Sequence, residues 1–257
     1  MKSKIYWMLS ILVIASFVLS VILLPIQVEG KGKPQKIVLI HYKKGFARPT
    51  CNNNGVCEPE LGEKKNCADC KNGGVEESTC YEFLGRGVKW KELPVEYVVH
   101  PDLEATVPGA ISAGAVTWDA HTSANLFGGY SKDKDATWDD ETPDGRNEMV
   151  FGDYPQSGVI AVTIIWGYFY GPPGRREIVE FDILFDTDFT WGDANFTSSV
   201  MDLENIATHE IGHGLGLGDL YNSACSEETM YGYSEYGEIK KRTLESGDIT
   251  GIQELYG

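Results

Sequence analysis

The sequence predicts an α+β domain, because patterns typical of strands and of helices alternate beyond residue 81. Runs rich in β-branched and aromatic residues predict strands, and apolar residues at helical spacing predict helices. We expect strands over residues 88–90 with 94–99, 148–151, 159–166 and 178–186. We expect helices over residues 107–123, 199–214 and 243–257, with Ser199 and Asp202 capping the second of them. Residues 126–147, rich in Gly, Asp and Lys, and residues 240–242, Lys-Lys-Arg, are expected at the surface.

The first 30 residues predict a targeting segment that is not part of the fold. Lys2 and Lys4 are followed by an uncharged run from Ile5 to Val28. This run is longer than the apolar core of an ordinary signal peptide, and it is long enough to span a bilayer. A cleaved signal peptide and an uncleaved membrane anchor therefore both stay open. In either case we expect the rest of the chain to be exported.

Cysteine usage predicts a disulfide-stapled segment before the main domain. The six cysteines are Cys51, Cys57, Cys67, Cys70, Cys80 and Cys225. Because an even count in an exported chain suggests disulfides, we expect two bridges within residues 51–70 and a long one between Cys80 and Cys225. Residues 31–80 are interpreted as a linker with a cysteine-rich segment, and residues 81–257 as the globular domain.

The chain is strongly acidic, with a formal net charge of −16. Such a charge argues against nucleic acid as a partner, because phosphates would be repelled. One acidic stretch holds Asp133, Asp135, Asp139, Asp140 and Asp144, and a second is Asp186-Thr187-Asp188. The first does not have the spacing of an EF-hand loop. A solvated loop and a polar strand end are the preferred interpretations, and Ca²⁺ binding is the alternative.

The stretch from Thr208 to Asp219, THEIGHGLGLGD, carries the strongest functional pattern. His209 and His213 are four residues apart, so on a helix both imidazoles project from one face and can reach one metal ion. Glu210 would lie beside the open coordination position without being a ligand. A sharp turn at Gly216, which has no Cβ to clash at positive φ, would return Asp219 as a third ligand. Three protein ligands are typical of a catalytic rather than a structural zinc site.

This motif resembles that of the metzincin metalloproteases, in which H-E-x-x-H-x-x-G-x-x-H is followed by a methionine turn. Asp219 replaces the last histidine, which is similar to the snapalysins. An anionic ligand neutralises part of the metal charge, so the metal should lower the pKa of its bound water less. The sequence Thr-Met-Tyr-Gly-Tyr at 229–233 stands where the turn would be. By this resemblance Met230 would lie beneath the metal ligands, and Tyr231 and Tyr233 would form a wall of the substrate pocket.

The resemblance extends to the matrixins and covers about residues 81–257. Residues 248–257 are similar to the end of a matrixin catalytic domain, and residues 89–118 are similar to an earlier part of it. This implies a twisted mixed sheet, mostly parallel with one antiparallel edge strand, with backing helices, an active-site helix and a small C-terminal subdomain. It implies one catalytic Zn²⁺, because a second, structural zinc would need more histidines than His41, His100 and His121 supply.

We therefore expect a zinc-dependent metalloendopeptidase that is secreted or membrane-anchored and acts on proteins or peptides outside the cell membrane. Glu210 would act as general base and then as general acid, and the substrate would lie extended along residues 159–166. One alternative is an exported cysteine-rich binding or adhesion protein with a vestigial metzincin domain. Another is a zinc hydrolase of non-peptide substrates. The intact Glu210 and the complete ligand set favour the peptidase. The sequence leaves the natural substrate and the oligomeric state open.

Overall fold

The computed structural model describes residues 32–46 and 79–257. The predicted targeting segment, residues 1–30, and the bridges expected within residues 51–70 lie outside this part of the chain. Among the described helices, none combines the length and the apolar character that crossing a membrane requires.

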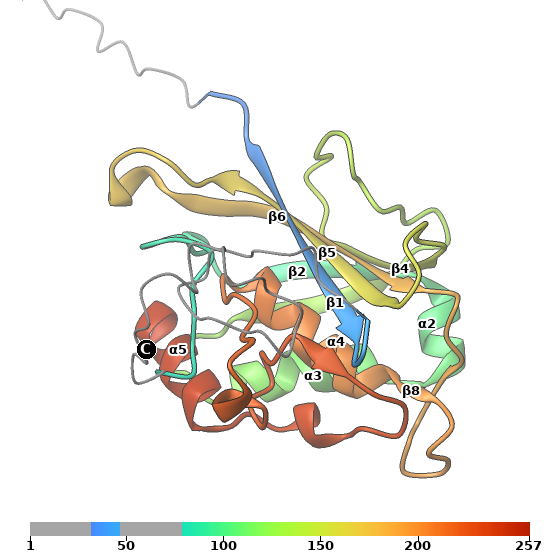
Figure 1. The fold of residues 1–257 in the computed structure, drawn as a ribbon. Helices are drawn as coiled ribbons and strands as arrows, with labels where there is room; N and C mark the ends of the chain where they lie inside the picture. Colours follow the sequence, from blue (N-terminus) through green and yellow to red (C-terminus); the bar gives the residue numbers. More distant parts are fainter. Residues whose placement is uncertain (1–31, 47–78) are drawn as a thin grey trace, which may run out of the picture. The chain divides into compact units, whose positions relative to one another are not determined.

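Within the described residues, a seven-stranded mixed sheet forms the frame of the domain (Figure 1). Its strands are β1 (Gln35–Lys43), β2 (Val95–Val99), β3 (Phe127–Lys132), β4 (Glu148–Gly152), β5 (Val159–Tyr168), β6 (Glu177–Asp186) and β9 (Tyr233–Ser234). They lie in the order β3-β2-β4-β6-β5-β1-β9. Strand β5 runs antiparallel to β6 and β1, and the other pairs are parallel. This confirms the predicted mixed sheet. A separate short pair joins β7 (Trp191–Gly192) to β8 (Met201–Asp202).

The helices lie against the sheet (Figure 1). Those of the described region are α2 (Pro101–Thr106), α3 (Ala110–Asp119), α4 (Leu203–Gly214) and α5 (Ser246–Tyr256), with 3₁₀ turns η2 (Pro173–Arg175), η3 (Ser223–Cys225) and η4 (Lys240–Arg242). Helix α3 packs on α4, where the Trp118 indole N–H donates to the Thr208 carbonyl at 2.7 Å. The core between sheet and helices includes the fully buried Trp118, Phe181 and Ile211.

Strand β1 is the largest difference from the sequence prediction. Residues 31–50, interpreted as linker, contain this nine-residue strand, which pairs with β5 on one side and with β9 on the other. Residues Lys33–Gly257 form one compact unit, so β1 and the predicted globular domain belong together. The run QKIVLIHYK has apolar residues at its centre, but nothing in its pattern identifies the strand that pairs with it.

Two further expectations are wrong because packing and backbone geometry override local pattern. Strand β3 forms inside the expected loop 126–147, since Phe127 and Tyr130 pack their rings on Tyr97 at centroid distances of 5.7 and 5.4 Å. The helix expected over 107–123 is present as the shorter α3, and the separate helix α2 precedes it. Helix α3 begins only after Gly109, whose φ of 81° is left-handed.

The start of α4 and the segment that contacts its C-terminal end also differ from the prediction. The helix begins at Leu203 rather than at 199, because the Asp202 carboxylate caps it and accepts from the Asn205 amide at 2.8 Å. Residues 88–90, expected as part of a strand, lie outside all strands. The Trp90 indole N–H instead donates to the Gly214 carbonyl at 2.7 Å, at the C-terminal end of α4.

The predicted long disulfide between Cys80 and Cys225 is confirmed. It ties the first described residues of the domain to η3, beyond the turn that follows α4. The bridge therefore joins two segments that both lie close to α4.

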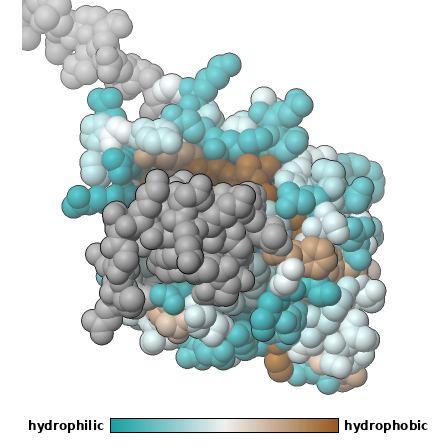
Figure 2. Space-filling model, viewed as in Figure 1, coloured by the Kyte–Doolittle hydropathy of each residue, from teal (hydrophilic) through white to brown (hydrophobic). Residues whose placement is uncertain are grey.

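Among the described residues on the face that Figure 2 shows, hydrophilic ones are the most numerous, and an apolar patch lies between them. The basic run 240–242, expected at the surface, departs from this prediction. Lys241 is fully buried, and its ammonium donates to the carbonyl oxygens of Thr229, at 3.3 Å, and of Tyr231. These bonds anchor the segment that contains Met230.

Candidate metal centre

Helix α4 places three of the predicted site residues inside the domain, because almost the whole helix is buried. Two glycines, which are poor helix formers, allow it to lie so deep. A Cβ at Gly212 would stand 2.4 Å from Met230 Sδ and 2.6 Å from Trp118 Cζ2. A Cβ at Gly214 would stand 3.0 Å from the Phe181 ring. The glycines therefore serve close packing of neighbouring segments around the site.

The chain turns sharply after α4 at Gly216, as the sequence predicts. Its φ is 108°, a conformation that residues with a side chain rarely adopt. A Cβ there would lie 2.9 Å from the Val88 carbonyl oxygen. Two residues on, the Gly218 amide donates to the Glu82 carbonyl at 2.8 Å and holds the outgoing segment. The turn brings Asp219 back toward α4.

The side chains of His209, His213 and Asp219 converge on one point. Asp219 Oδ1 lies 3.3 Å from His209 Nε2 and 3.4 Å from His213 Nε2. Two atoms that each bind a tetrahedral zinc at about 2.1 Å are about 3.4 Å apart. The spacing of these atoms therefore fits a shared zinc ion.

Backbone carbonyls orient both imidazoles. His209 Nδ1 lies 2.7 Å from the Thr229 oxygen, and His213 Nδ1 lies 2.9 Å from the Leu217 oxygen. Because a carbonyl oxygen can only accept, both rings carry their proton on Nδ1 and present the lone pair of Nε2. Both Nε2 atoms and Asp219 Oδ1 are buried without a hydrogen-bond partner among the described residues. A metal ion would satisfy all three.

The charge states of His209 and Asp219 also suit a divalent metal. Burial lowers the pKa of His209 to about 3, so this imidazole is neutral at physiological pH. Burial alone would raise the pKa of Asp219, but the attraction of His213 and His209 outweighs it and holds this pKa well below its usual range. A neutral imidazole and an ionised carboxylate are the forms in which these side chains bind zinc.

Tyr221 is a residue of the centre that the sequence did not indicate. Its hydroxyl donates to Asp219 Oδ2 at 2.6 Å. This bond leaves Oδ1 directed at the imidazoles. The one signal in the sequence is a tyrosine two residues after Asp219, which many loops contain.

The carboxylate of Glu210 lies fully buried beside His209, held by two side chains from the sheet. Thr163 on β5 donates its hydroxyl to Oε2, and His41 on β1 lies with Nδ1 2.9 Å from Oε1. Burial raises the pKa of Glu210. The sequence indicated neither contact, because 47 and 169 residues separate these partners from Glu210.

The segment predicted as a methionine turn passes close to α4. Met230 is buried with its sulfur against Gly212, the residue that precedes His213. Its amide donates to an Asp248 oxygen at 3.1 Å, so α5 holds the turn in place. The rings of Tyr231 and Tyr233 lie 5.8 Å apart, and Tyr233 packs with Tyr42, Val159, Val162 and Tyr221.

The remaining histidines lie in separate places. His100 caps α2 by accepting from the Asp102 amide at 3.3 Å. His121 follows α3, and its Nδ1 lies 2.9 Å from the Thr117 carbonyl oxygen. Of the three histidines weighed for a structural zinc, His41 is the one that reaches the metal centre, through its contact with Glu210.

Acidic residues form further clusters away from α4. They are Asp139 with Glu180 and Asp182, Asp139 with Asp144 and Glu148, and Asp153 with Asp186 and Asp188. Asp133 instead pairs with Arg146 at 2.7 Å, and Asp135 with Lys134 at 2.6 Å. In the first cluster burial raises the pKa of Glu180 to about 7 and that of Asp182 to about 9. Asp182 Oδ2 and Glu148 Oε2 are buried without a hydrogen-bond partner among the described residues.

Comparison with known proteins finds one family to which the C-terminal part of the chain is similar. Residues 169–257 match the family described as matrixin. Metalloendoproteinase 4-MMP of Arabidopsis thaliana is 34% identical over 103 residues, which are 40% of this chain and 27% of that protein. Matrix metalloproteinase-18 of Xenopus laevis is 27% identical over 212 residues, which are 79% and 40% of the two chains. Stromelysin-1 of Mus musculus is 27% identical over 203 residues, which are 77% and 38%.

The chain thus spans less than half the length of each of these relatives. The matched region contains α4, the turn at Gly216 and the segment around Met230. The mixed sheet with its antiparallel β5 agrees with the fold that the matrixin resemblance implied. The sequence match and the fold together make this part of the chain similar to the catalytic domains of matrixin-like metzincins.

Proposed function

We propose that the chain is a zinc-dependent metalloendopeptidase, which hydrolyses peptide bonds of proteins outside the cell membrane. One observation carries the proposal: three buried ligand atoms, on His209, His213 and Asp219, face one another beside the Glu210 carboxylate. When bound there, Zn²⁺ supplies a Lewis acid that polarises water and the scissile carbonyl. The names of the relatives, metalloendoproteinase and matrix metalloproteinase, support the same activity.

In this proposal the three ligands hold the ion and their partners hold the ligands. The Thr229 and Leu217 carbonyls fix the two imidazoles, and Tyr221 fixes the carboxylate of Asp219. Such outer contacts orient metal ligands and raise metal affinity. Met230, whose sulfur lies against Gly212, would form an apolar floor beneath them.

Glu210 is the residue that we expect to move protons. Burial raises the pKa of Glu210, which makes its carboxylate a stronger base. It would accept a proton from the attacking water and then donate it to the leaving amine. The bond from Thr163 holds the carboxylate in one orientation while this happens.

The experiment that tests the activity is Glu210→Ala, assayed on casein and on peptides together with elemental analysis for zinc. We expect retained zinc and a rate at least ~100-fold lower, the usual size of a general-base contribution. Glu204→Ala on the first turn of the same helix is the matched control, since Glu204 pairs with Arg242 at 3.4 Å, away from the centre. Unchanged turnover in Glu210→Ala would remove this residue from the mechanism.

The ligand set is tested separately by Asp219→Ala. We expect weaker metal retention, because two imidazoles would then have to hold the ion alone. Dialysis against a graded series of chelator concentrations measures this. A stoichiometric and tightly held zinc in the variant would contradict the role of Asp219.

The division of the chain is part of the proposal. Residues 1–30 would be a signal peptide or membrane anchor, residues 31–80 would contain the linker and cysteine-rich segment, and residues 81–257 would be the catalytic domain. The Cys80–Cys225 bridge supports export, since disulfides persist in oxidising compartments. Mass spectrometry of the mature N-terminus, with fractionation of membranes, tests whether the first segment is retained.

Calcium is proposed as a second cofactor, held at the cluster of Asp139, Glu180 and Asp182. Carboxylate oxygens are the ligands that Ca²⁺ prefers. The buried Asp182 Oδ2, which lacks a hydrogen-bond partner among the described residues, supports this site. Calcium-dependent stability is the property to measure.

A further inference from the structure

The edge of β5 that we expected to receive a substrate is covered by a segment of the same chain. Strand β1 pairs antiparallel with β5 from Gln35, opposite Gly167, to Tyr42, opposite Val159. At its end it pairs parallel with β9, where Lys43 lies opposite Ser234. Figure 1 shows β1 running along β5 toward the region of α4. An extended peptide bound by main-chain hydrogen bonds would need the same edge.

His41 is the residue of β1 that contacts the proposed catalytic carboxylate. Its Nδ1 lies 2.9 Å from Glu210 Oε1, and its Nε2 lies 3.1 Å from Ser234 Oγ. Its ring centroid is 4.0 Å from that of His209. Because its Nδ1 is at hydrogen-bond distance from Oε1, the His41 imidazole takes the position that a water beside Oε1 would need. Thr163 already occupies Oε2.

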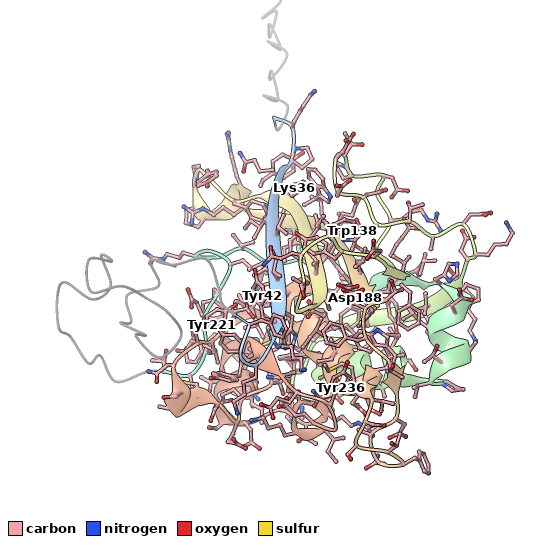
Figure 3. The ribbon with its side chains drawn as sticks, turned by 45° about the vertical axis from the view of Figure 1, so that its right-hand side comes forward. Lys36, Tyr42, Trp138, Asp188, Tyr221 and Tyr236 are labelled. Atoms are coloured by element: carbon pink, nitrogen blue, oxygen red, sulfur yellow. A yellow bond between two sulfur atoms is a disulfide. The ribbon has the colours of Figure 1, made fainter. Side chains whose placement is uncertain are left out.

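The end of β1 is anchored around this contact. The Lys43 amide donates to the Gly158 carbonyl at 2.8 Å, and the Lys44 amide to the Ser234 carbonyl at 3.0 Å. The Tyr42 ring is buried in the cluster that contains Tyr221, and Figure 3 shows these two side chains at the lower end of the strand. The end of β1 that carries His41 is therefore bonded on both sides, to the residue that precedes β5 and to β9.

The rest of β1 lies on the domain without completing its core. None of its residues is a buried member of the main core, against which Ile37 and Leu39 only pack. Val38 is 42% exposed, whereas nine of the ten residues of β5 are buried. The sheet from β3 to β5 could therefore keep its core if β1 detached.

We propose that β1 is an intramolecular inhibitor strand, which occupies the substrate edge of β5 and holds His41 against Glu210 until it is displaced. The proposal rests on the proposed peptidase function. Strand and substrate would use the same edge, so they compete. Detachment of β1 should therefore lower KM and leave kcat unchanged. If the detached state is populated at about 0.1–10%, opening the site fully raises kcat/KM by ~10- to 1,000-fold.

A reversible lock tests the competition in the full chain. Val38 and Ile164 are directly opposite each other on β1 and β5, and Val38 points away from the side that carries His41. A disulfide in Val38→Cys/Ile164→Cys would hold β1 on β5. We expect the oxidised form to lose cleavage of a fluorogenic peptide and the reduced form to regain it. The single-cysteine variants and the unmodified chain, treated with the same reductant, control for the Cys80–Cys225 bridge.

A second variant, with its matched control, tests the open site without changing His41 or Glu210. Lys43→Pro removes the amide that donates to Gly158, and Lys43→Ala keeps it. We expect the proline variant to lower KM and to speed amide hydrogen exchange over residues 35–43, and the alanine variant to do neither. If the oxidised disulfide variant and the proline variant both cleaved the peptide like the unmodified chain, β1 would be a permanent strand of the domain. This result would overturn the proposal.

A binding measurement separates this inference from the peptidase function. A fluorescent peptide with the sequence of residues 33–46 should bind the proline variant and fail to bind the oxidised lock, whether or not any form is catalytic. Binding with that selectivity but no cleavage by any zinc-loaded form would support the strand competition and reject the proposed activity. Equal binding to both forms would reject the competition.

Discussion

Gly216→Ala is the substitution that most directly perturbs the turn on which the proposed metal centre depends. At a φ of 108° a residue with a Cβ is strained, at a cost of about 1–3 kcal/mol. The new Cβ would also lie 2.9 Å from the Val88 carbonyl oxygen, which is backbone and can yield only if its segment shifts. For a domain of this size 1 kcal/mol corresponds to about 2–4 °C in Tm. We therefore expect Tm to fall by at least ~2 °C, and by up to ~12 °C from strain alone.

The same strain should weaken zinc binding. Any relaxation of residue 216 moves Asp219, whose Oδ1 now lies 3.3 and 3.4 Å from the two imidazole nitrogens. Metal–ligand distances tolerate only about 0.2 Å, so we expect zinc affinity to fall by at least ~10-fold. Chelator competition measures this affinity. Calorimetry with and without zinc measures how much zinc raises Tm. This increase should be smaller in the variant, because ligand binding to the folded state raises Tm according to affinity.

Gly218→Ala is the matched control in the same turn. A Cβ at this position meets Glu82 Cγ at 3.4 Å, which is an ordinary contact. We expect it to change Tm and zinc affinity little. If Gly216→Ala bound zinc as tightly as the unmodified chain and melted at the same temperature, the turn would not be what positions Asp219.

Two further predictions concern groups around the sites. Tyr221→Phe removes the donor to Asp219 Oδ2 and should weaken zinc binding by ~10- to 100-fold. Chelator competition measures the affinity, and circular dichroism shows whether the fold is intact. Unaltered affinity would contradict the orienting role of Tyr221. Burial raises the pKa of Asp182 from 3.8 to about 9, so without calcium the folded state binds this proton more tightly than the unfolded state. The free energy of unfolding should therefore fall as pH rises from ~4 to ~9, by up to ~1.4 kcal/mol per pH unit. Urea unfolding at several pH values should show a shallower slope in Asp182→Asn, and in the unmodified chain with saturating calcium; identical slopes in all three would contradict both assignments.

The metal-site geometry could be predicted because its determinants are local. Helical spacing alone brings His209 and His213 to one face, and a glycine at a sharp turn is a local backbone preference. Both depend on a single stretch, 208–219. The same holds for strand β5, whose continuous β-branched run predicts a buried strand.

Features that depend on distant partners could not be predicted. Gly128 and Gly129 weaken β3 locally, and the strand exists because Phe127 and Tyr130 pack on the Tyr97 ring of β2. Lys241 belongs to a run of three basic residues, yet carbonyl oxygens near Met230 provide acceptors that make its burial tolerable. Pairing of β1 with β5 joins segments more than a hundred residues apart, and an apolar run in a linker has the same local appearance as a strand.

The choice of aspartate at position 219 explains why Tyr221 belongs to the centre. A histidine ligand is oriented by donating its second ring N–H to a carbonyl, as His209 and His213 do here. An ionised carboxylate has no hydrogen to donate, so its second oxygen needs a donor instead. The Tyr221 hydroxyl is that donor, at 2.6 Å from Oδ2. Asp219 and Tyr221 therefore act as one unit. Without the hydroxyl, Oδ2 would be a buried acceptor that could bind a metal as well as Oδ1 does, and the carboxylate would lose its single orientation.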